Sequence, residues 1–335
     1  MADVNDTTKR RARCLSLLSG GLDSMLAVCV LRAQGAHVEG IVFDSPFFDT
    51  GPAQRAARQL AVPLHVVDFS ADILELVNDP PRGFGGHMNP CIDCHARMIR
   101  RTGERMAAMG FDCIATGEVM GQRPMSQSKQ SLGVVLRDSG FADDVVRPLS
   151  AKLLSPSRAE REGLLDREQL LGLSGRSRKP QIALAAAFGI RDYPAPAGGC
   201  LLTDGGYCSR LRDLAAHEGL GDCRLLGLLR IGRQMRLPGG TKCIIGRDKA
   251  DNDALAAAAA EPDAVLHAAA MRGPTVLLPG GARDEADLAT AVRICAAYGP
   301  QNQAFEARIC VRRGGIEEVR VVAVEPREPF AAWLL

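Results

Sequence analysis

The chain has 335 residues, a formal net charge of +2 and only 4% aromatic residues. Its length favours two domains, and its near-neutral charge excludes a strong overall attraction to nucleic acid. No apolar run reaches the roughly 18 residues of a membrane span, and residues 1–12 lack the apolar core of a signal peptide. We therefore expect a disordered lead over residues 1–12 and a cytoplasmic protein with reduced cysteines and no membrane partner.

A short strand, a glycine-rich turn and a helix begin the folded part of the chain. Residues 13–18 are apolar enough for a buried strand, and residues 25–31 for a helix packed on it. The turn between them, S-G-G-L-D-S, occupies residues 19–24. Free backbone N–H groups and the positive end of a helix dipole meet at such a turn, which therefore predicts a phosphate site.

Each residue type in this turn suits a nucleotide. Gly20 and Gly21 allow the backbone to approach an anion, and the hydroxyls of Ser19 and Ser24 add hydrogen-bond donors. Asp23 is placed to position a Mg²⁺ ion that accompanies the nucleotide. The pattern is neither a Walker motif nor G-x-G-x-x-G, and the alternative interpretation is a serine- and glycine-rich turn without a ligand.

The following segments alternate between strand and helix. Such alternation predicts a doubly wound parallel sheet, in which ligands bind beyond the carboxyl ends of the strands. The long Gly/Pro-rich loop at 79–90 is expected at this edge, with Phe43, Asp44 and Gly117 at strand ends. The expected strands are 38–43, 64–69 and 113–116, and the expected helices are 53–60 and 94–109.

The middle of the chain is less regular in sequence. We expect a polar loop over residues 119–146 and mostly helix over residues 147–192, followed by a Pro/Gly segment at 194–199. A helix over residues 207–218 then leads to a shift in composition near residues 219–221. The expected domains are residues 13–220 and 221–335.

The last part of the chain predicts a smaller α+β domain. Two Gly-containing turns, Gly239-Gly240 and Gly314-Gly315, are expected to fold hairpins. Between them we expect helices at 251–260 and 285–298 and short strands near 264–267 and 275–278.

Three of the eleven cysteines lie where chemistry is expected. Cys91 and Cys94 form C-x-x-C at a helix start, which favours thiolates. The pair alone is compatible with a redox pair, half a zinc site, two ligands of an iron–sulfur cluster, or chance. With His95 it also matches the haem c attachment pattern. We set that pattern aside because haem attachment requires export and no export signal is expected. Cys200 follows the Pro/Gly segment and is either a third cluster ligand or structural.

Taken together, four segments resemble the PP-loop ATP pyrophosphatases. The resemblance is to the sulfurtransferases that thiolate tRNA uridines, the 4-thiouridine synthetases and 2-thiouridylases, and it covers residues 13 to about 204. It implies an adenine nucleotide alpha-hydrolase-like domain that uses ATP and Mg²⁺ to adenylate a tRNA uridine before sulfur replaces its oxygen. The matching segments are S-G-G-L-D-S, N-P-C-I-D-C, A-T-G-E-V-M-G-Q-R-P-M-S-Q and G-G-C-L-L-T-D.

The resemblance also implies the nucleotide site. Arg97 is a candidate ATP contact, but with Arg101 and Arg105 it also forms a basic stripe along one helix, so both interpretations stay open. The expected ATP-binding residues are Leu18, Ser19, Gly20, Gly21, Asp23, Ser24, Phe43, Asp44, Arg97, Gly117 and Gln127.

The sulfur chemistry implied by the resemblance has two forms. In one, Cys91, Cys94 and Cys200 hold a 4Fe–4S or 3Fe–4S cluster whose open iron carries sulfide. In the other, two cysteines work as a persulfide carrier and its partner, without a cluster. We expect these three cysteines and Asp23 to be the catalytic residues, with sulfide, or a cysteine desulfurase or persulfide carrier, as the sulfur donor.

The segments at 244–255 and 261–278 resemble the NFACT-type RNA-binding domain. Its basic residues are expected to contact tRNA phosphates, which position an RNA without reading its sequence; the alternative is an ordinary exposed basic edge. The expected RNA-binding residues are Arg230, Arg233, Arg236, Lys242, Arg247 and Lys249.

The favoured function is therefore an ATP-dependent tRNA sulfurtransferase that forms AMP and pyrophosphate. One alternative is a PP-loop ligase or synthase acting on a small molecule, which the RNA-binding-like segments disfavour. Another is an RNA-binding module without catalysis, which the intact S-G-G-L-D-S turn and the three matched cysteines disfavour.

Overall fold

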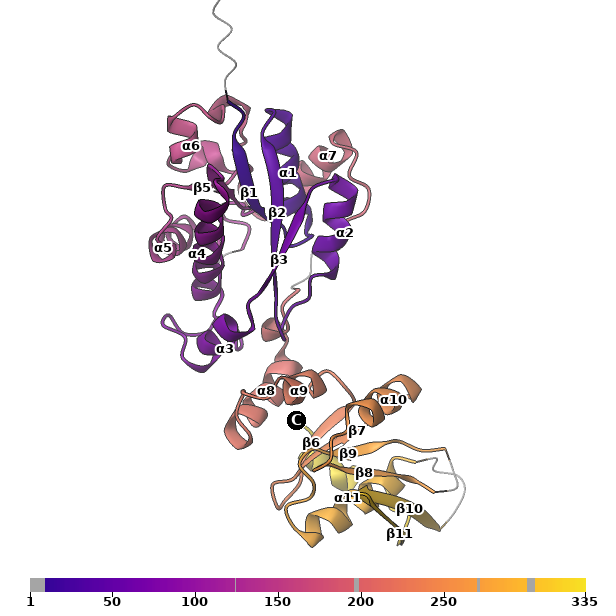
Figure 1. Cartoon of the computed structure of the whole chain (residues 1–335). Coiled ribbons are helices and arrows are strands. Elements are labelled where there is room, and N and C mark those ends of the chain that lie inside the picture. The colour runs from indigo at the N-terminus through magenta and orange to yellow at the C-terminus, as the bar shows by residue number, and fades with distance from the viewer. Residues whose placement is uncertain (1–9, 124, 196–198, 270–271, 300–304) are drawn as a thin grey trace, which may run out of the picture. The chain divides into compact units, whose positions relative to one another are not determined.

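The computed structural model describes residues 10–123, 125–195, 199–269, 272–299 and 305–335. They divide into two units between Thr203 and Asp204 (Figure 1). Most of the expected disordered lead, and residues 196–198 of the Pro/Gly segment, lie outside the described residues.

The first unit is built on a five-stranded parallel sheet with the strand order β3-β2-β1-β4-β5. The order reverses between β1 and β4, which creates a switch point at the carboxyl edge. The expected doubly wound parallel sheet is thereby confirmed. Its strands are β1 (Arg13–Leu17), β2 (His37–Asp44), β3 (Leu64–Asp68), β4 (Cys113–Ala115) and β5 (Val145–Val146).

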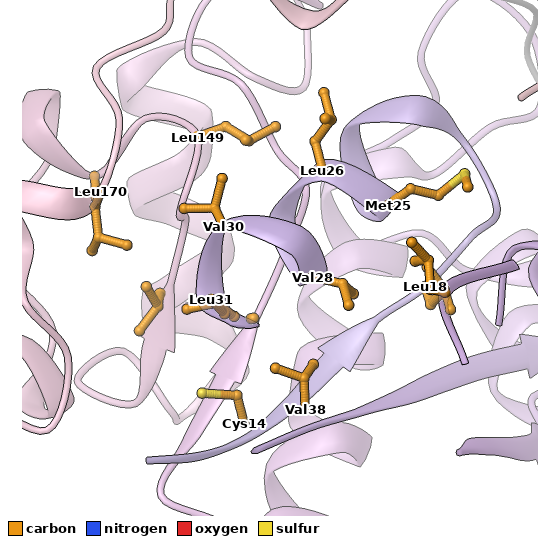
Figure 2. Close-up of a cluster of buried hydrophobic side chains, with 14 of the residues drawn as sticks. Cys14, Leu18, Met25, Leu26, Val28, Val30, Leu31, Val38, Leu149 and Leu170 are labelled. Atoms are coloured by element: carbon orange, nitrogen blue, oxygen red, sulfur yellow. The ribbon is translucent and has the colours of Figure 1, made fainter. Parts of the chain in front are cut away.

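Helices cover both faces of this sheet (Figure 1). α1 contacts α2 and α7 on one face, and α4 contacts α3 and α5 on the other. Figure 2 shows the core under α1, where Leu18, Val28 and Leu31 are buried. The helices are α1 (Leu22–Ala33), α2 (Gly51–Leu60), α3 (Ser70–Asn78), α4 (Cys91–Met109), α5 (Lys129–Ser139) and α7 (Lys179–Ala187).

The structure corrects two expectations for the middle of the chain. Residues 119–146, expected as a loop, contain α5, whose start is capped by the Ser128 side chain accepting from the Ser131 N–H, and the short strand β5. Residues 147–192, expected as mostly helix, are mostly irregular, because prolines and glycines such as Pro156 and Gly163 interrupt them. Besides α7 they contain only η1 (Ala151–Leu153), α6 (Arg158–Arg161) and η2 (Arg167–Gln169).

The second unit is built on a six-stranded antiparallel sheet with the order β11-β10-β8-β9-β7-β6. Both expected hairpins are present, β6–β7 and β10–β11, and α11 packs against β8, β10 and β11. The strands are β6 (Arg233–Arg236), β7 (Lys242–Ile245), β8 (Ala264–Ala268), β9 (Val276–Leu278), β10 (Glu306–Arg313) and β11 (Ile316–Ala323). The helices are α8 (Gly205–His217), α9 (Cys223–Leu228), α10 (Lys249–Ala258), α11 (Glu285–Ala297) and η4 (Glu328–Trp333).

Helix α8 belongs to the second unit by its contacts, although the expected domain boundary at residue 220 places it in the first. Asp213 on α8 forms ion pairs with Arg236 of β6 and Lys242 of β7. A composition shift along the sequence does not report such a pairing, so the sequence alone does not locate this boundary.

Candidate functional site

The S-G-G-L-D-S turn connects β1 to the N-terminus of α1. The Ser24 hydroxyl donates to the Gly21 carbonyl oxygen at 2.8 Å, and the Ser19 and Ser24 hydroxyl oxygens lie 3.4 Å apart. Gly21 is the N-cap residue and no side chain caps the helix. The first N–H groups of α1 and the positive end of its dipole are therefore available to an anion.

Two glycines hold this turn against its neighbours. Gly20 has a φ of +81°, and a Cβ atom there would lie 2.3 Å from the backbone carbon of Pro52, at the start of α2. A Cβ atom on Gly117, just after β4, would lie 2.5 Å from the Ser24 nitrogen. Only residues without a side chain allow this close packing. The structure thus brings the predicted Gly117 directly against the turn.

Asp23 faces a polar group from other elements. Its Oδ2 accepts a hydrogen bond from Gln122 Nε2 at 3.0 Å, whereas its buried Oδ1 has no hydrogen-bond partner. Burial raises the pKa of the Asp23 carboxyl, and Gln122, Arg178 and Arg123 act in the opposite direction. An open carboxylate oxygen next to arginines suits a magnesium ion that carries phosphate oxygens.

The loop over residues 121–127 carries two glutamines to this region. Its ends are joined by the Gly121 N–H donating to the Gln127 carbonyl at 2.7 Å. Gln127 is buried, and its Oε1 has no hydrogen-bond partner. Sequence analysis predicted Gln127 as an ATP contact but did not single out Gln122. Gln122 donates a hydrogen bond to Asp23 and lies within the same matched segment.

Three further predicted residues lie at the carboxyl edge of β1 and β2. The Leu18 N–H donates to the Ile41 carbonyl at 2.9 Å, so Leu18 continues the pairing of β1 with β2. Phe43 is buried and its ring packs 5.1 Å from that of Phe69. Asp44 is exposed at the end of β2. A ligand at this edge could therefore contact Leu18 and Phe43 only through their backbone, because their side chains are buried in the core.

Arg97 is engaged with carboxylates of α3. It forms ion pairs with Asp72 at 2.9 Å and Glu75 at 3.0 Å, and Arg101 pairs with the same Asp72 at 3.1 Å. These contacts fasten α3 to α4. A role of Arg97 in binding ATP stays a prediction, which would require exchange of these partners.

A buried ion pair that the sequence did not reveal joins Glu118, after β4, to Arg147, after β5, and His95 of α4 lies beside it. Glu118 accepts from Arg147 Nε at 2.8 Å and from Thr116 Oγ1 at 3.1 Å, and it lies 3.3 Å from His95 Nδ1. Burial alone would raise the pKa of Glu118, but Arg147 and His95 lower it far more, so the net pKa lies well below its ordinary value. Glu118 stays ionised and helps fix Gly117 relative to the helix that carries Cys94.

Cys94 interacts electrostatically with the other two predicted cysteines. Cys94 is buried, and the pKa of its thiol is raised well above the ordinary value by burial and then by the charges of Cys200 and Cys91. Cys200, distant in sequence, therefore lies within electrostatic range of Cys94. Cys200 is held there because the next residue, Leu201, donates its N–H to the Phe47 carbonyl at 2.9 Å, in the loop after β2.

The donor set is suited to soft metals, but it is not arranged as a finished metal site. Among the residues that the structure describes, no group of three or more His, Cys, Asp or Glu side chains is positioned to hold a metal ion. The Cys91 sulfur lies 3.2 Å from Asn89 Nδ2. The chemistry of three thiols fits an iron–sulfur cluster, and it also fits a pair of reacting cysteines.

Two of the six predicted RNA-binding cations, the buried Lys242 and the partly buried Arg236, belong to an ion-pair cluster of the second unit. Arg236 pairs with Asp213 at 2.6 Å and with Glu218 at 2.7 Å, and Lys242 pairs with Asp213 at 3.0 Å. Only 2% of the Lys242 side chain is exposed. These two cations hold α8 to the sheet.

The other four cations are more accessible. Lys249 and Arg230 are exposed, and Arg247 is half exposed while pairing with Asp251 at 2.6 Å. Arg233 lies over the Tyr298 ring at 5.5 Å. A phosphate contact is thus sterically open to Lys249, Arg230 and Arg247, and it remains a prediction for all of them.

The strand β10 adds basic residues that the sequence did not single out. Ala307, Ile309 and Val311 are buried in the core formed with α11, so by the alternation of a strand Arg308 and Arg312 lie on the opposite face. Both arginines are exposed. The alternation of apolar and basic residues in this strand could have indicated these exposed arginines from the sequence alone.

Comparison with known proteins yields two matched domains. Residues 12–137 match the family model of the tRNA methyl transferase HUP domain, and residues 232–333 match that of the NFACT protein RNA binding domain. Each model covers less than half of the chain. No helix among the described residues is long and apolar enough to cross a membrane.

Similar curated proteins include tRNA-specific 2-thiouridylases. The one from Corynebacterium kroppenstedtii is 33% identical over 124 residues, 31% of this chain and 33% of that protein. The one from Paracoccus denitrificans is 25% identical over 233 residues, 62% of this chain and 57% of that protein. The chain thus spans between about a third and somewhat more than half of the length of these relatives.

Solved structures add a weaker similarity. A 4-thiouridine synthetase–RNA complex with bound ATP is 20% identical, with a TM-score of 0.35 over 53% of this chain and 52% of that chain. A tRNA methyltransferase subunit from Methanocaldococcus jannaschii is 16% identical, with a TM-score of 0.35 over 52% of this chain and 76% of that chain. The expected resemblance is confirmed in both parts by the family models and curated relatives: residues 12–137 are similar to the tRNA methyl transferase HUP domain, and residues 232–333 to the NFACT protein RNA binding domain.

Proposed function

We propose that this chain is an ATP-dependent tRNA sulfurtransferase. The observation that carries the proposal is the presence, in one unit, of an uncapped S-G-G-L-D-S turn packed on Gly117 and of a buried Cys94 within electrostatic range of Cys91 and Cys200. The similarity to 2-thiouridylases supports thiolation as the reaction, and the match to an RNA-binding domain supports tRNA as the substrate.

The first step is adenylation. A uridine carbonyl oxygen attacks the α-phosphate of ATP, the bond from this phosphorus to the bridging oxygen breaks, and pyrophosphate leaves. The backbone N–H groups at the start of α1 and the hydroxyls of Ser19 and Ser24 bind the phosphates, and they stabilise the charge that develops there. Asp23 holds the magnesium ion that accompanies ATP.

The second step exchanges oxygen for sulfur. A sulfur nucleophile attacks the activated carbon, the carbon–oxygen bond breaks, and AMP leaves. Cys91, Cys94 and Cys200 are proposed to hold an iron–sulfur cluster, which when bound would supply a sulfide at its open iron. With sulfide as the donor, this exchange requires no electron transfer. Cys94 is buried and its thiol resists ionisation, so without a metal the reactive thiolates would be Cys91 or Cys200.

The test is thiolation of unmodified tRNA by the full-length chain with Mg·ATP and sulfide, read by mass spectrometry of the tRNA nucleosides. Cys200→Ala is expected to abolish the thiolated nucleoside while adenylation, measured as pyrophosphate release, continues. Cys223→Ala, at an exposed cysteine of α9, is the matched control and should retain activity. A Cys200→Ala protein that still thiolates tRNA would overturn the role of Cys200.

The cluster is tested separately. Protein purified without oxygen is expected to contain iron and acid-labile sulfide and to absorb in the visible range. Loss of this absorbance in Cys91→Ala together with retained thiolation would support the persulfide pathway instead. Pyrophosphate release that does not depend on tRNA would favour a small-molecule substrate.

A further inference from the structure

Gln181 is a buried side chain whose hydrogen-bonding groups are unused. It lies in the first turn of α7, only 1% of it is exposed, and neither Nε2 nor Oε1 has a hydrogen-bond partner. Buried amides are nearly always paired in native proteins. An unpaired buried amide therefore points to a partner that the described part of the chain does not supply.

The Gln181 amide belongs to the surroundings of Asp23. Helix α7 packs directly on α1, which carries Asp23. The Gln181 amide faces the Asp23 carboxyl without forming a hydrogen bond of ordinary geometry, and Gln181 and the Arg178 charge both lower the pKa of that carboxyl against the effect of burial. Arg178 is the N-cap residue of α7, and its Nε is also buried without a hydrogen-bond partner. No side chain caps α7, so its first N–H groups are available as well.

The unused groups are of both kinds. Gln181 Nε2 and Arg178 Nε are donors, whereas Asp23 Oδ1, Gln122 Oε1 and Gln181 Oε1 are acceptors. A bare anion would be repelled by the Asp23 carboxylate, and a bare cation by Arg178 and Arg123. A magnesium ion carrying phosphate oxygens satisfies both sets, because carboxylate and amide oxygens suit Mg²⁺ and its waters, while arginine and amide N–H groups suit phosphate.

We propose that Arg178 and Gln181 form the wall of the pyrophosphate subsite opposite Asp23 and, together with Gln122, bind the magnesium-bound leaving group of ATP. This inference rests on the proposed function and assigns a binding role to the start of α7. The adenosine part of the nucleotide does not use these residues.

The test measures equilibrium binding by calorimetry on the full-length chain, with Mg·pyrophosphate, Mg·ATP and AMP as separate ligands. Gln181→Ala and Arg178→Ala are each expected to weaken Mg·pyrophosphate and Mg·ATP about tenfold, as the loss of one charge-assisted contact would, and to leave AMP binding unchanged. Gln181→Glu keeps the side-chain size but replaces a donor with a charge that repels phosphate, so it should weaken pyrophosphate binding further. Gln130→Ala, at an exposed glutamine of α5, is the matched control.

The outcomes separate this inference from the proposed function. Unchanged pyrophosphate binding in Gln181→Ala, or an equal loss of AMP binding, would overturn the inference while wild-type ATP binding still supports the function. Wild-type protein that binds neither ATP nor pyrophosphate would overturn both. Thermal unfolding of each variant identifies a general loss of structure, and Arg178→Lys, which keeps the charge, should recover part of the binding if the contact is electrostatic.

Discussion

Two partly buried carboxylates, one in each unit, differ in how completely the chain supplies partners for their oxygen atoms. In the second unit Asp213 is paired with both Arg236 and Lys242. In the first unit Asp23 has one oxygen bonded to Gln122 and one without a partner, and Gln122 Oε1 and both polar atoms of the Gln181 amide also lack partners. A satisfied cluster stabilises the fold, whereas an unsatisfied one is maintained for a ligand. The comparison teaches that burial and charge alone do not identify a binding site.

The largest effect on stability is expected at the satisfied cluster. Asp213→Ala should lower the free energy of unfolding of the second unit by about 3–5 kcal/mol, because the buried Lys242 charge loses its partner. Chemical denaturation followed by circular dichroism measures this loss. Binding of Mg·ATP should not change; a protein with normal stability would show that the cluster does not hold α8 in place.

The largest effect on activity is expected at the unsatisfied group. Asp23→Asn should reduce pyrophosphate release by about 10²–10³-fold, as does the loss of one charge-stabilising group in other active sites. Stability should be unchanged or higher, because a buried carboxylate without full pairing is removed. Parallel measurements of pyrophosphate release and of the unfolding midpoint test both expectations. If Asp23→Asn lost stability as well as activity, Asp23 would be a structural group like Asp213 and not a ligand site.

A smaller effect is expected from the glycine that packs on the turn. Gly117→Ala places a Cβ atom 2.5 Å from the Ser24 nitrogen, so the turn must shift and ATP binding should weaken by about 1–3 kcal/mol. Gly133→Ala in α5 is the control, because a Cβ there meets nothing within 4 Å, and alanine favours a helix. Equal ATP affinities of the two variants would show that the turn does not need its close contact with Gly117.

The smallest and most specific effect is a difference in pH dependence. The pKa of Asp213 is lowered, because Arg236 and Lys242 outweigh the effect of its burial. The stability that the ionised Asp213 contributes is fully present above about 3.9, the pKa of an unfolded aspartate. It is lost as the pH falls through the lower pKa of the folded protein. Asp23 has a raised pKa because of burial, so its ionisation costs stability as the pH rises through that value. Acidification should therefore stabilise the wild type relative to Asp23→Asn and destabilise it relative to Asp213→Asn.

These signs are checked by unfolding curves of wild type, Asp23→Asn and Asp213→Asn from neutral pH down to well below about 3.9, the ordinary aspartate pKa. The gain of Asp23→Asn over wild type should shrink on acidification, since the wild-type carboxyl becomes protonated. The deficit of Asp213→Asn should also shrink, but at a lower pH. As the pH is lowered, magnesium-dependent ATP binding should weaken at a higher pH than it would with an aspartate of ordinary pKa, because the pKa of Asp23 is raised.

Much of the first unit was predictable because its signals are local. The run from Arg13 to Leu17, the turn at residues 19–24 and the apolar helix after it are contiguous, and local periodicity and glycine positions describe them well. The interior of residues 147–192 was not predictable in the same way, since proline and glycine outweighed an otherwise helical composition.

The sequence by itself determined the strand–turn–helix unit, the three chemically distinctive cysteines and the two domain resemblances, because each is encoded in neighbouring residues. The tertiary structure decided that Cys200 lies within electrostatic range of Cys94, that Gln181 and Arg178 act on the Asp23 carboxyl, and that Arg236 and Lys242 are used within the fold. These pairings join residues far apart in the chain. They depend on how helices pack on the sheets, which local pattern does not encode.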